Sequence, residues 1–274
     1  MGQSSDMRTA WRLGGPLRRF EARDEPRREI VVEGHVVPVV DTGGGAVEAG
    51  DSGRCFVLVH GIGASSRYFL PLVRALQPDA RVLAMDLPGF GGSPRPQQVL
   101  TIPDLARVVG AVVEQSNVTR AVLVGHSMGC QVVAELDAQQ PGLAGGLVLV
   151  GPTVDPGNRS PLRHFLMLAH NSLYEPWWVN AVLTADYLRC GIRHYLRTLR
   201  PMLTHRIERL LTTSPTPAVV VRGSRDRVAG RRWSTSAARM LARGRVVEIP
   251  HHAHGVHASD PEGVAAICRE LLAD

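Results

Sequence analysis

The sequence predicts an α/β fold in which a mainly parallel, eight-stranded sheet is flanked by helices and carries a helical insertion. Short apolar runs alternate with helical patterns from about residue 29 onward. These runs are apolar throughout, which is typical of parallel strands covered on both faces. Residues 153–214 carry helical patterns without a strand pattern and are too many for an ordinary connection, so they predict an insertion.

Strand patterns occur at residues 30–32, 36–40, 55–60, 81–85, 121–124, 147–150, 218–221 and 246–249. Apolar residues recur at helical spacing in segments 68–76, 103–115, 128–139, 234–242 and 261–272. Because parallel neighbours need crossover connections, this alternation predicts right-handed strand–helix–strand units.

The same patterns divide the chain into parts. Residues 1–28 are polar, rich in arginine and unpatterned, and we interpret them as a tail that is flexible or loosely docked. Residues 29–152 and 215–274 form the predicted α/β core, and residues 153–214 form the insertion between two of its strands. A chain of 274 residues can bury a full core in one such domain.

All 31 basic residues are arginine. Without lysine, neither Schiff-base chemistry nor a P-loop nucleotide site is possible. The net charge of +6 invites two interpretations, binding to nucleic acid and binding to a membrane surface. We favour neither, because arginines gather in segment 222–245 and, at helical spacing, at Arg189, Arg193 and Arg197, a pattern typical of a solvated helix face.

Four cysteines, at positions 55, 130, 190 and 268, are widely separated and lie in apolar or helical contexts. This usage favours buried free thiols over a disulfide framework, and we expect a cytoplasmic protein. No run of about twenty apolar residues is present, so no membrane span is expected. The start of the chain also lacks the apolar core of a signal peptide.

The most informative motif joins a strand to a helix. An apolar strand runs into Gly125-His126-Ser127-Met128-Gly129, and a helical pattern follows. Gly-x-Ser-x-Gly in this context is the pattern of a nucleophile elbow, where the two glycines leave room for a strained turn. Ser127 is therefore the candidate nucleophile, and it needs a base and an orienting carboxylate.

Both partners occur further along the chain in the order serine, acid, histidine. Asp226 is the only carboxylate in the loop after the strand at residues 218–221. The loop after the last strand holds His251, His252, His254 and His257, and spacing alone leaves the choice among these four open.

With the elbow and the acid loop, residues 60–65 (His-Gly-Ile-Gly-Ala-Ser) and 86–93 (Asp-Leu-Pro-Gly-Phe-Gly-Gly-Ser) complete four motifs that resemble the α/β-hydrolase superfamily. The resemblance runs from about residue 29 to the C-terminus. The family's terminal signature is a histidine followed, after a short gap, by a proline that opens the last helix. Pro261 fits that proline, so the resemblance implies His254 as the base, with His252 as the fallback. His251 stands where the family usually has glycine.

The histidine cluster and a second aspartate allow two other interpretations. The histidines at 251–257 can be read as a metal site, but no carboxylate or cysteine pair accompanies them, and we expect neither a metal nor a cofactor. Asp155, after the strand at 147–150, is a second possible acid, since some relatives place the acid there. Beside Pro156 and Gly157 it is more simply a turn residue.

The resemblance also implies an oxyanion hole and a lid. Its donors are expected to be the backbone N–H groups of Ile62 and Met128, with Gly63 as the alternative. The insertion at 153–214 resembles the family's helical lid, which covers the pocket. Substrate-binding candidates are Gly61 and Gly63 in the oxyanion loop and Trp177 and Trp178 in the insertion. The tryptophans can also pack the insertion onto the core, and we expect a mixture in which at least one of them lines the entrance.

These residues predict a serine hydrolase, resembling carboxylesterases, that cleaves a carboxylic ester or a similar acyl bond through a catalytic triad and an acyl-enzyme. The expected partner is a small ester-like substrate, and the protein is expected to be a monomer or homodimer. The principal alternative is a C–C bond hydrolase of the ring-cleavage type, in which an inward-facing Arg163, Arg189 or Arg193 would bind an acidic dienoate. A non-catalytic, ligand-binding member of the fold is a further alternative.

Overall fold

The computed structural model describes residues 17–20, 25–43 and 55–272 and confirms the predicted fold class. All eight predicted strands are present in one sheet. They are β1 (Arg27–Val32), β2 (His35–Asp41), β3 (Cys55–Val59), β4 (Arg81–Met85), β5 (Ala121–His126), β6 (Ala144–Val150), β7 (Ala218–Gly223) and β8 (Gly244–Ile249).

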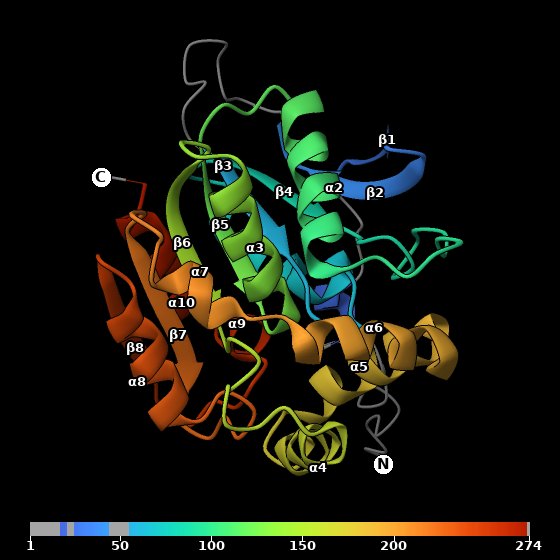
Figure 1. The fold of residues 1–274 in the computed structure, drawn as a ribbon. Helices are drawn as coiled ribbons and strands as arrows, with labels where there is room; N and C mark the ends of the chain where they lie inside the picture. The colour runs from blue at the N-terminus through green and yellow to red at the C-terminus, as the bar shows by residue number, and fades with distance from the viewer. Residues whose placement is uncertain (1–16, 21–24, 44–54, 273–274) are drawn as a thin grey trace, which may run out of the picture.

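The sheet order is β1-β2-β4-β3-β5-β6-β7-β8 (Figure 1). Strand β2 runs antiparallel to both β1 and β4, while β3 to β8 pair in parallel. Chain order and sheet order differ at β3 and β4, so β3 and β5 become neighbours. Parallel strands have their carboxyl ends on the same side of the sheet. The loops after β3, β5, β6, β7 and β8 therefore lie together at the edge formed by these carboxyl ends, which is where ligands bind in open α/β sheets.

The helices of the core are α1 (Leu70–Leu76), α2 (Ile102–Gln115), α3 (Met128–Gln139), α8 (Arg231–Met240), α9 (Val256–Ser259) and α10 (Pro261–Glu270). Helices α2, α3 and α8 cover one face of the sheet, and α1 and α10 cover the other. Residues along each strand alternate between the two apolar layers: in β5, for example, Leu123 belongs to the first and Val122 and Val124 to the second. Because both faces of the sheet are buried, successive residues of a core strand are apolar.

Local signals account for several helix boundaries. Helix α2 begins after Thr101, whose hydroxyl accepts a hydrogen bond from the Asp104 N–H while the Asp104 carboxylate accepts from the Thr101 N–H, a complete capping box. Helix α10 begins at Pro261 after Asp260, whose carboxylate accepts from the Gly263 N–H. These helices start within one residue of the predicted positions because their caps are encoded locally.

Residues 151–217 join β6 to β7 and contain four helices, α4 (Pro161–Ser172), α5 (Trp177–Cys190), α6 (Ile192–Thr204) and α7 (Ile207–Leu211). In Figure 1, α4, α5 and α6 lie beyond the carboxyl ends of the core strands, beside the edge where their loops gather. We refer to α4–α7 as the helical insertion. None of the helices in the described residues is both long enough and apolar enough to cross a bilayer.

The segment predicted to be a tail is described only at residues 17–20 and 25–28. A 3-10 helix, η1 (Leu17–Phe20), places Phe20 in an apolar cluster with Trp178, where the ring centroids are 5.7 Å apart. Strand β1 begins at Arg27, earlier than predicted, because the polar residues 27–29 are exposed on an edge strand and leave no apolar signal. The rest of the predicted tail lies outside the described residues.

Candidate active site

Ser127 lies on a strained turn between β5 and α3. Its backbone angles are φ 55° and ψ −118°, an unusual conformation for a residue with a side chain. Its N–H donates to the carbonyl of Val150 (2.9 Å), which fixes the turn against the end of β6. The Ser127 side chain makes no capping hydrogen bond to α3, so its hydroxyl is free for another role.

The two glycines of the motif are required by close backbone contacts. A Cβ atom on Gly125 would lie 2.5 Å from the carbonyl oxygen of Gly129, and a Cβ on Gly129 would lie 2.0 Å from the carbonyl oxygen of Val59. Both neighbours are backbone atoms of packed elements and cannot move aside. The spacing of the motif therefore reflects the packing of α3 against β3 and β5 rather than a generic turn.

His254 and Asp226 form a buried pair on the loops after β8 and β7. The Nδ1–H of His254 donates to Oδ2 of Asp226 (2.9 Å). The other oxygen of Asp226 accepts hydrogen bonds from the N–H groups of Val228 and Ala229 at 2.8 and 2.9 Å. With Nδ1 carrying the proton, Nε2 of His254 is the lone-pair nitrogen, and within the described part of the chain it has no hydrogen-bond partner.

Strand β7 also contributes to the position of the acid loop. The buried guanidinium of Arg222 donates to the backbone carbonyls of Asp226 (2.9 Å) and Ala229 (3.1 Å) and forms an ion pair with Glu248 of β8. These contacts tie the Asp226 loop to the ends of two neighbouring strands. The buried Arg222 therefore helps to hold the Asp226 carboxylate in position.

Ser127 and His254 lie at the same point of the sheet edge. The N–H of Ser127 donates to the carbonyl of Val150. Gly151, which follows Val150, is so close to His254 that a Cβ atom on this glycine would lie 2.8 Å from Nδ1 of the histidine. His126, which precedes the serine, donates from Nε2 to the carbonyl of His254 (3.2 Å), and the two rings are 4.8 Å apart. The structure therefore brings the elbow that carries Ser127 into contact with the Asp226–His254 pair through His126, while no hydrogen bond joins Ser127 to His254 among the described residues.

Opposing effects set the protonation of this pair. Burial by itself would lower the pKa of His254, but the charge and hydrogen bond of Asp226 outweigh burial and raise that pKa above the ordinary value. Burial would raise the pKa of Asp226, but His254 and the two backbone donors outweigh it and hold that pKa below its usual value. The carboxylate therefore stays ionised beside an imidazole that can take up a proton.

The other histidines of this loop have separate environments. His257 is buried against Tyr68, Phe69 and His126, and burial lowers its pKa to about 3. Nδ1 of His252 is 2.7 Å from Oγ of Ser259. His251, which stands at the usual glycine position, has a positive φ of 67° that glycine would adopt without strain.

The predicted oxyanion loop, after β3, lies against the serine. A Cβ on Gly61 would be 2.9 Å from the Cβ of Ser127, so the loop backbone is in contact with the elbow. Ile62 follows Gly61, and Met128 is the first residue of α3, where helix N–H groups have no intrahelical acceptor. Gly63 has φ 77°, and a side chain there would strike the ring of Tyr187 from α5.

Contacts from the helical insertion reach both loops. Glu175, in the link between α4 and α5, accepts a hydrogen bond on Oε1 from the N–H of Gly255 (2.6 Å), the residue after His254. Burial raises the pKa of Glu175, although Gly255 and His254 act in the opposite direction. Asp186 of α5 accepts from the hydroxyl of Ser65 (2.8 Å) beside the oxyanion loop. Neither acid is predicted from the sequence, because isolated carboxylates in a helical segment carry no local signal.

Other predicted residues lie elsewhere. Trp177 is 59% exposed, and Trp178 packs on Phe20 and on an apolar cluster that includes Ala64 of the oxyanion loop. Asp155 accepts a hydrogen bond from the Gly157 N–H (2.9 Å), as expected of a turn residue.

Arg163, Arg189 and Arg193 are all exposed. All four cysteines are buried and free, as predicted.

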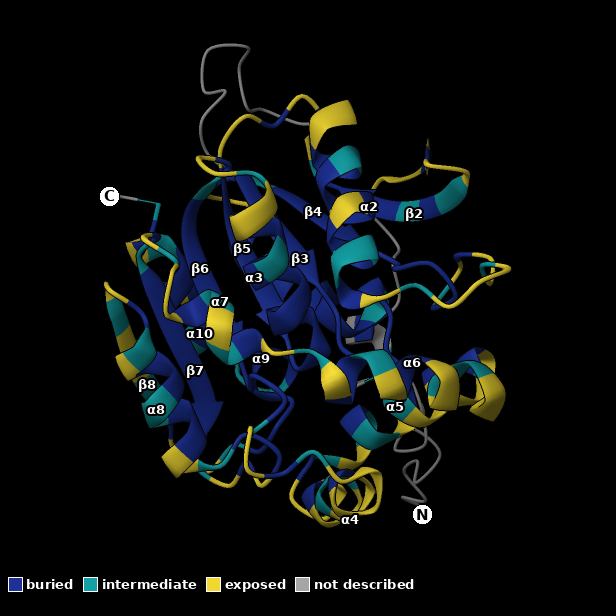
Figure 2. Cartoon of the chain, in the orientation of Figure 1, coloured by how far each residue is buried: buried dark blue, intermediate teal, exposed yellow. Residues whose placement is uncertain are grey.

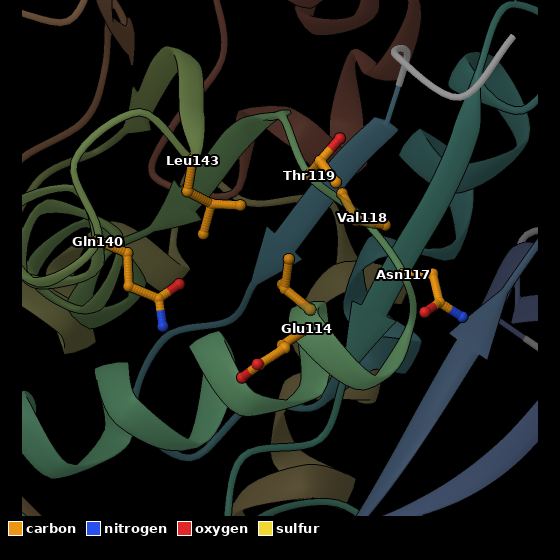
Figure 3. A pocket seen from close by; sticks show the side chains of 7 residues that line it. Glu114, Asn117, Val118, Thr119, Gln140 and Leu143 are labelled. Carbon is orange, nitrogen blue, oxygen red and sulfur yellow. The ribbon is translucent and has the colours of Figure 1, made fainter.

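A hollow of about 440 Å³ lies far from these residues. Figure 3 shows it between the end of α2 and the segments that enter β5 and β6, lined by Glu114, Asn117 and Gln140 among others. These segments precede the strands, whereas Ser127 follows β5. The hollow is therefore at the opposite end of the sheet and plays no part in the site around Ser127.

Comparison with known proteins points to one family. The model of the alpha/beta hydrolase family matches residues 56–267. The dihydrolipoyllysine-residue acetyltransferase component of the acetoin cleaving system of Pseudomonas putida is 28% identical over 236 residues, which are 78% of this chain and 62% of that protein. The sn-1-specific diacylglycerol lipase ABHD11 of Xenopus laevis is 32% identical over 126 residues, 44% of this chain and 40% of the lipase.

The chain thus spans less than two thirds of the length of these curated relatives. Among solved structures, the esterase RhEst1 from Rhodococcus sp. ECU1013 superimposes with a TM-score of 0.71 and 23% identity. The superposition covers 90% of this chain and 98% of the esterase. At this identity the similarity shows a shared fold.

Proposed function

The chain belongs to the alpha/beta hydrolase family, and from this premise we propose that it is a serine hydrolase that cleaves a carboxylic ester or a similar acyl bond. One observation carries the proposal. Ser127 lies on a strained elbow at the carboxyl ends of the strands, where the Asp226–His254 pair leaves the buried Nε2 of His254 without a hydrogen-bond partner among the described residues. His126, the residue before Ser127, is hydrogen-bonded to the backbone of His254, so the elbow meets the residue that carries the lone-pair nitrogen, and general-base catalysis requires such a nitrogen within reach of the serine hydroxyl.

In the proposed mechanism, His254 takes the proton of Ser127 as its oxygen attacks the substrate carbonyl. Asp226 holds the imidazole in the required tautomer and stabilises its charged form. The N–H groups of Ile62 and Met128 stabilise the negative oxygen of the tetrahedral intermediate. His254 then protonates the leaving group, and a water molecule activated by His254 hydrolyses the acyl-enzyme and restores Ser127.

The helical insertion is proposed to act as the lid over this site. Glu175 binds the backbone next to His254, and Asp186 binds Ser65 beside the oxyanion loop, so the insertion is tied to both halves of the site. Ser127 is only 5% exposed in this arrangement. A substrate therefore enters when the insertion moves, and the side chains beneath α4 and α5 select it.

An ester is favoured over the acidic dienoate of a C–C hydrolase. That alternative needs an arginine facing the site, and the three candidates in the insertion, Arg163, Arg189 and Arg193, are exposed. The names of the diacylglycerol lipase and the esterase also agree with ester cleavage. We therefore expect hydrolysis of uncharged acyl esters to exceed hydrolysis of dienoate acids in a direct comparison of kcat/KM.

A fluorophosphonate probe tests the proposed function, because it phosphonylates serine hydroxyls that a neighbouring histidine activates. We expect one labelled peptide, containing Ser127, identified by mass spectrometry of the whole chain. His254→Ala should remove the labelling because the hydroxyl loses its base. His252→Ala is the matched control and should label like the wild type, which also tests the fallback assignment.

Two results would contradict this function. Absence of labelling in a folded wild-type chain would favour the non-catalytic, ligand-binding alternative. Labelling that survives His254→Ala but is lost in His252→Ala would show that the wrong base has been assigned.

The pH dependence of kcat/KM provides a separate prediction. His254 acts as a base only when neutral, and the Asp226 carboxylate raises its pKa above 6.5. Activity should therefore be full at alkaline pH and fall as the pH drops through an apparent pKa above 6.5. The measurement is kcat/KM for a soluble ester against pH, with ester stability checked in the absence of enzyme.

His257 and His164 provide internal comparisons for that profile. Burial lowers their pKa values to about 3 and about 4, so neither should titrate between pH 5 and pH 8. A profile with its midpoint clearly below 6.5 would contradict the assignment of His254, since the measured base would lack the raised pKa.

A further inference from the structure

Helix α4 carries an apolar stripe that faces away from the protein. The side chains of Leu162, Phe165 and Leu166 are 67%, 64% and 57% exposed, and that of Leu173, directly after the last helical residue, is 77% exposed. Their spacing puts them on one face of the helix, while His164 and Asn171 are buried on the other. Figure 2 shows α4 at the periphery with much of its surface exposed. An exposed stripe of large apolar residues is typical of a docking surface.

A groove of about 650 Å³ lies beside this stripe. One wall is the flank of α4, with Arg163 and His170, and the other is the loop after β7, with Arg225 and Arg227. Leu166 belongs to both the stripe and the groove, so the two features are continuous. We call the stripe and the groove together the α4 face.

The charge of the α4 face is uncompensated. Within residues 17–20, 25–43 and 55–272, the guanidinium groups of Arg163, Arg225 and Arg227 make no hydrogen bond or ion pair, whereas Arg222 and Arg231, also in the groove, are paired with Glu248. Asp226 lines the groove floor, but its carboxylate is bound by His254 and two backbone N–H groups.

The rest of the insertion adds little negative charge, and the half-buried Glu208 of α7 forms an ion pair with Arg159. Between residues 156 and 207 the sequence has two acidic residues, Glu175 and Asp186, and both are buried. Exposed arginines in this stretch include Arg189, Arg193 and Arg197. The outer side of the insertion therefore combines large apolar side chains with an excess of positive charge.

We propose that the α4 face docks on the surface of an anionic phospholipid bilayer. In this arrangement Leu162, Phe165, Leu166 and Leu173 enter the boundary between headgroups and acyl chains. Arg163, Arg225 and Arg227 lie against the lipid phosphates. Apolar residues on one helix face, flanked by cationic side chains, form the pattern of an interfacial helix.

Both features are needed to select this partner. A small free anion would fill the arginine groove but leave the apolar stripe exposed. An uncharged lipid surface would cover the stripe but leave the arginines unpaired. An anionic bilayer is complementary to both, and this docking does not depend on the hydrolytic function proposed above.

The test is co-sedimentation of the full chain with two kinds of vesicle, phosphatidylcholine alone and phosphatidylcholine mixed with phosphatidylglycerol. We expect binding to the mixed vesicles and at least tenfold weaker binding to phosphatidylcholine alone. Salt at about 1 M shortens the Debye length to about 3 Å and should weaken the binding. Inorganic phosphate and glycerophosphate are tested as free competitors, and at millimolar concentration neither should displace the protein.

Two double variants separate the apolar and the charged contributions. Leu162→Ser with Phe165→Ser should weaken binding at least tenfold, because two large apolar side chains are lost from the interface. Arg163→Gln with Arg225→Gln should weaken binding to mixed vesicles about 25-fold, because each arginine near an anionic surface contributes roughly a factor of five. The four side chains are exposed, so both variants should retain the melting temperature of the wild type.

Matched controls lie away from the α4 face. Val31→Ser removes an exposed apolar side chain from β1, and Arg120→Gln removes an exposed arginine from the segment before β5. Neither change should alter vesicle binding. Leu188→Ser, in α5 of the same insertion, tests whether any exposed leucine of the insertion suffices and should have a smaller effect than the α4 variant.

Several outcomes would overturn the proposal. Equal binding to both kinds of vesicle, no binding at all, or unchanged binding of the two double variants would each exclude an anionic bilayer as the partner. A dimer in sedimentation equilibrium that dissociates in Leu162→Ser with Phe165→Ser would assign the stripe to a second copy of the chain. Displacement by millimolar phosphate would reduce the groove to a site for small anions.

Discussion

Ser127→Ala is expected to lower kcat for ester hydrolysis by about 10⁶-fold, the size of effect seen when a triad nucleophile is removed. Without the hydroxyl, no acyl-enzyme forms, and only the weak effects of substrate binding and the oxyanion hole remain. The protein should still fold, because the Ser127 side chain makes no capping hydrogen bond and alanine tolerates the same backbone angles as serine. The measurements are steady-state kinetics and the melting temperature.

Cys130→Ala is the matched control for this experiment. Cys130 lies three residues after Ser127, is buried, and has a thiol pKa raised well above its usual value by burial. Its sulfur donates to the carbonyl of Gly125 (3.1 Å), so it packs within the elbow. Activity should survive its replacement. Substantial activity in Ser127→Ala, or its loss in Cys130→Ala, would show that the nucleophile has been wrongly assigned.

Asp226→Asn is expected to lower kcat by about 10⁴-fold while the fold is retained. Asparagine can keep the hydrogen bonds from Val228 and Ala229 on its carbonyl oxygen, and its amide then faces Nδ1 of His254 as a donor. Nδ1 must accept, so the proton moves to Nε2, which can no longer take the proton of Ser127. The measurement is kcat across the pH range in which the wild type is active.

The control for the acid is Asp155→Asn. Asp155 follows β6, where some relatives carry the catalytic acid, but in this structure it accepts a hydrogen bond from the Gly157 N–H, which asparagine can also do. Its replacement should change kcat by less than about twofold, since asparagine preserves that turn. A loss of activity in Asp155→Asn comparable with that in Asp226→Asn would move the acid to the loop after β6.

The elbow shows how much a sequence can specify locally. A Cβ atom on Gly125 or Gly129 would clash with neighbouring backbone atoms, so both positions require glycine. The motif therefore predicts the turn around Ser127 directly. The apolar runs likewise predict the strands, because each is buried on both faces of the sheet. The acid was also predictable, because its strand is recognisable and Asp226 is the only carboxylate in the loop after that strand.

The surroundings of the site were less predictable. Glu175 contacts the backbone beside His254 from 80 residues away, and no local pattern distinguishes it from an exposed acid. At least one of Trp177 and Trp178 was expected to line the entrance of the pocket, with packing of the insertion onto the core as the other role. One is largely exposed and the other packs on Phe20, since the rotation of α5 about its axis depends on contacts with η1 and the core.

The sequence by itself determined the order of strands and helices, the elbow at Ser127 and the loop that carries its acid, because backbone sterics and two-sided burial act over a few neighbouring residues. Among the histidines, the sequence needed a family resemblance to select His254. Only the tertiary structure decided which histidine meets Asp226, which acids of the insertion reach the site, and that an apolar stripe and an arginine groove form one surface. These features depend on contacts between distant segments, whose geometry is set by the packing of the whole domain.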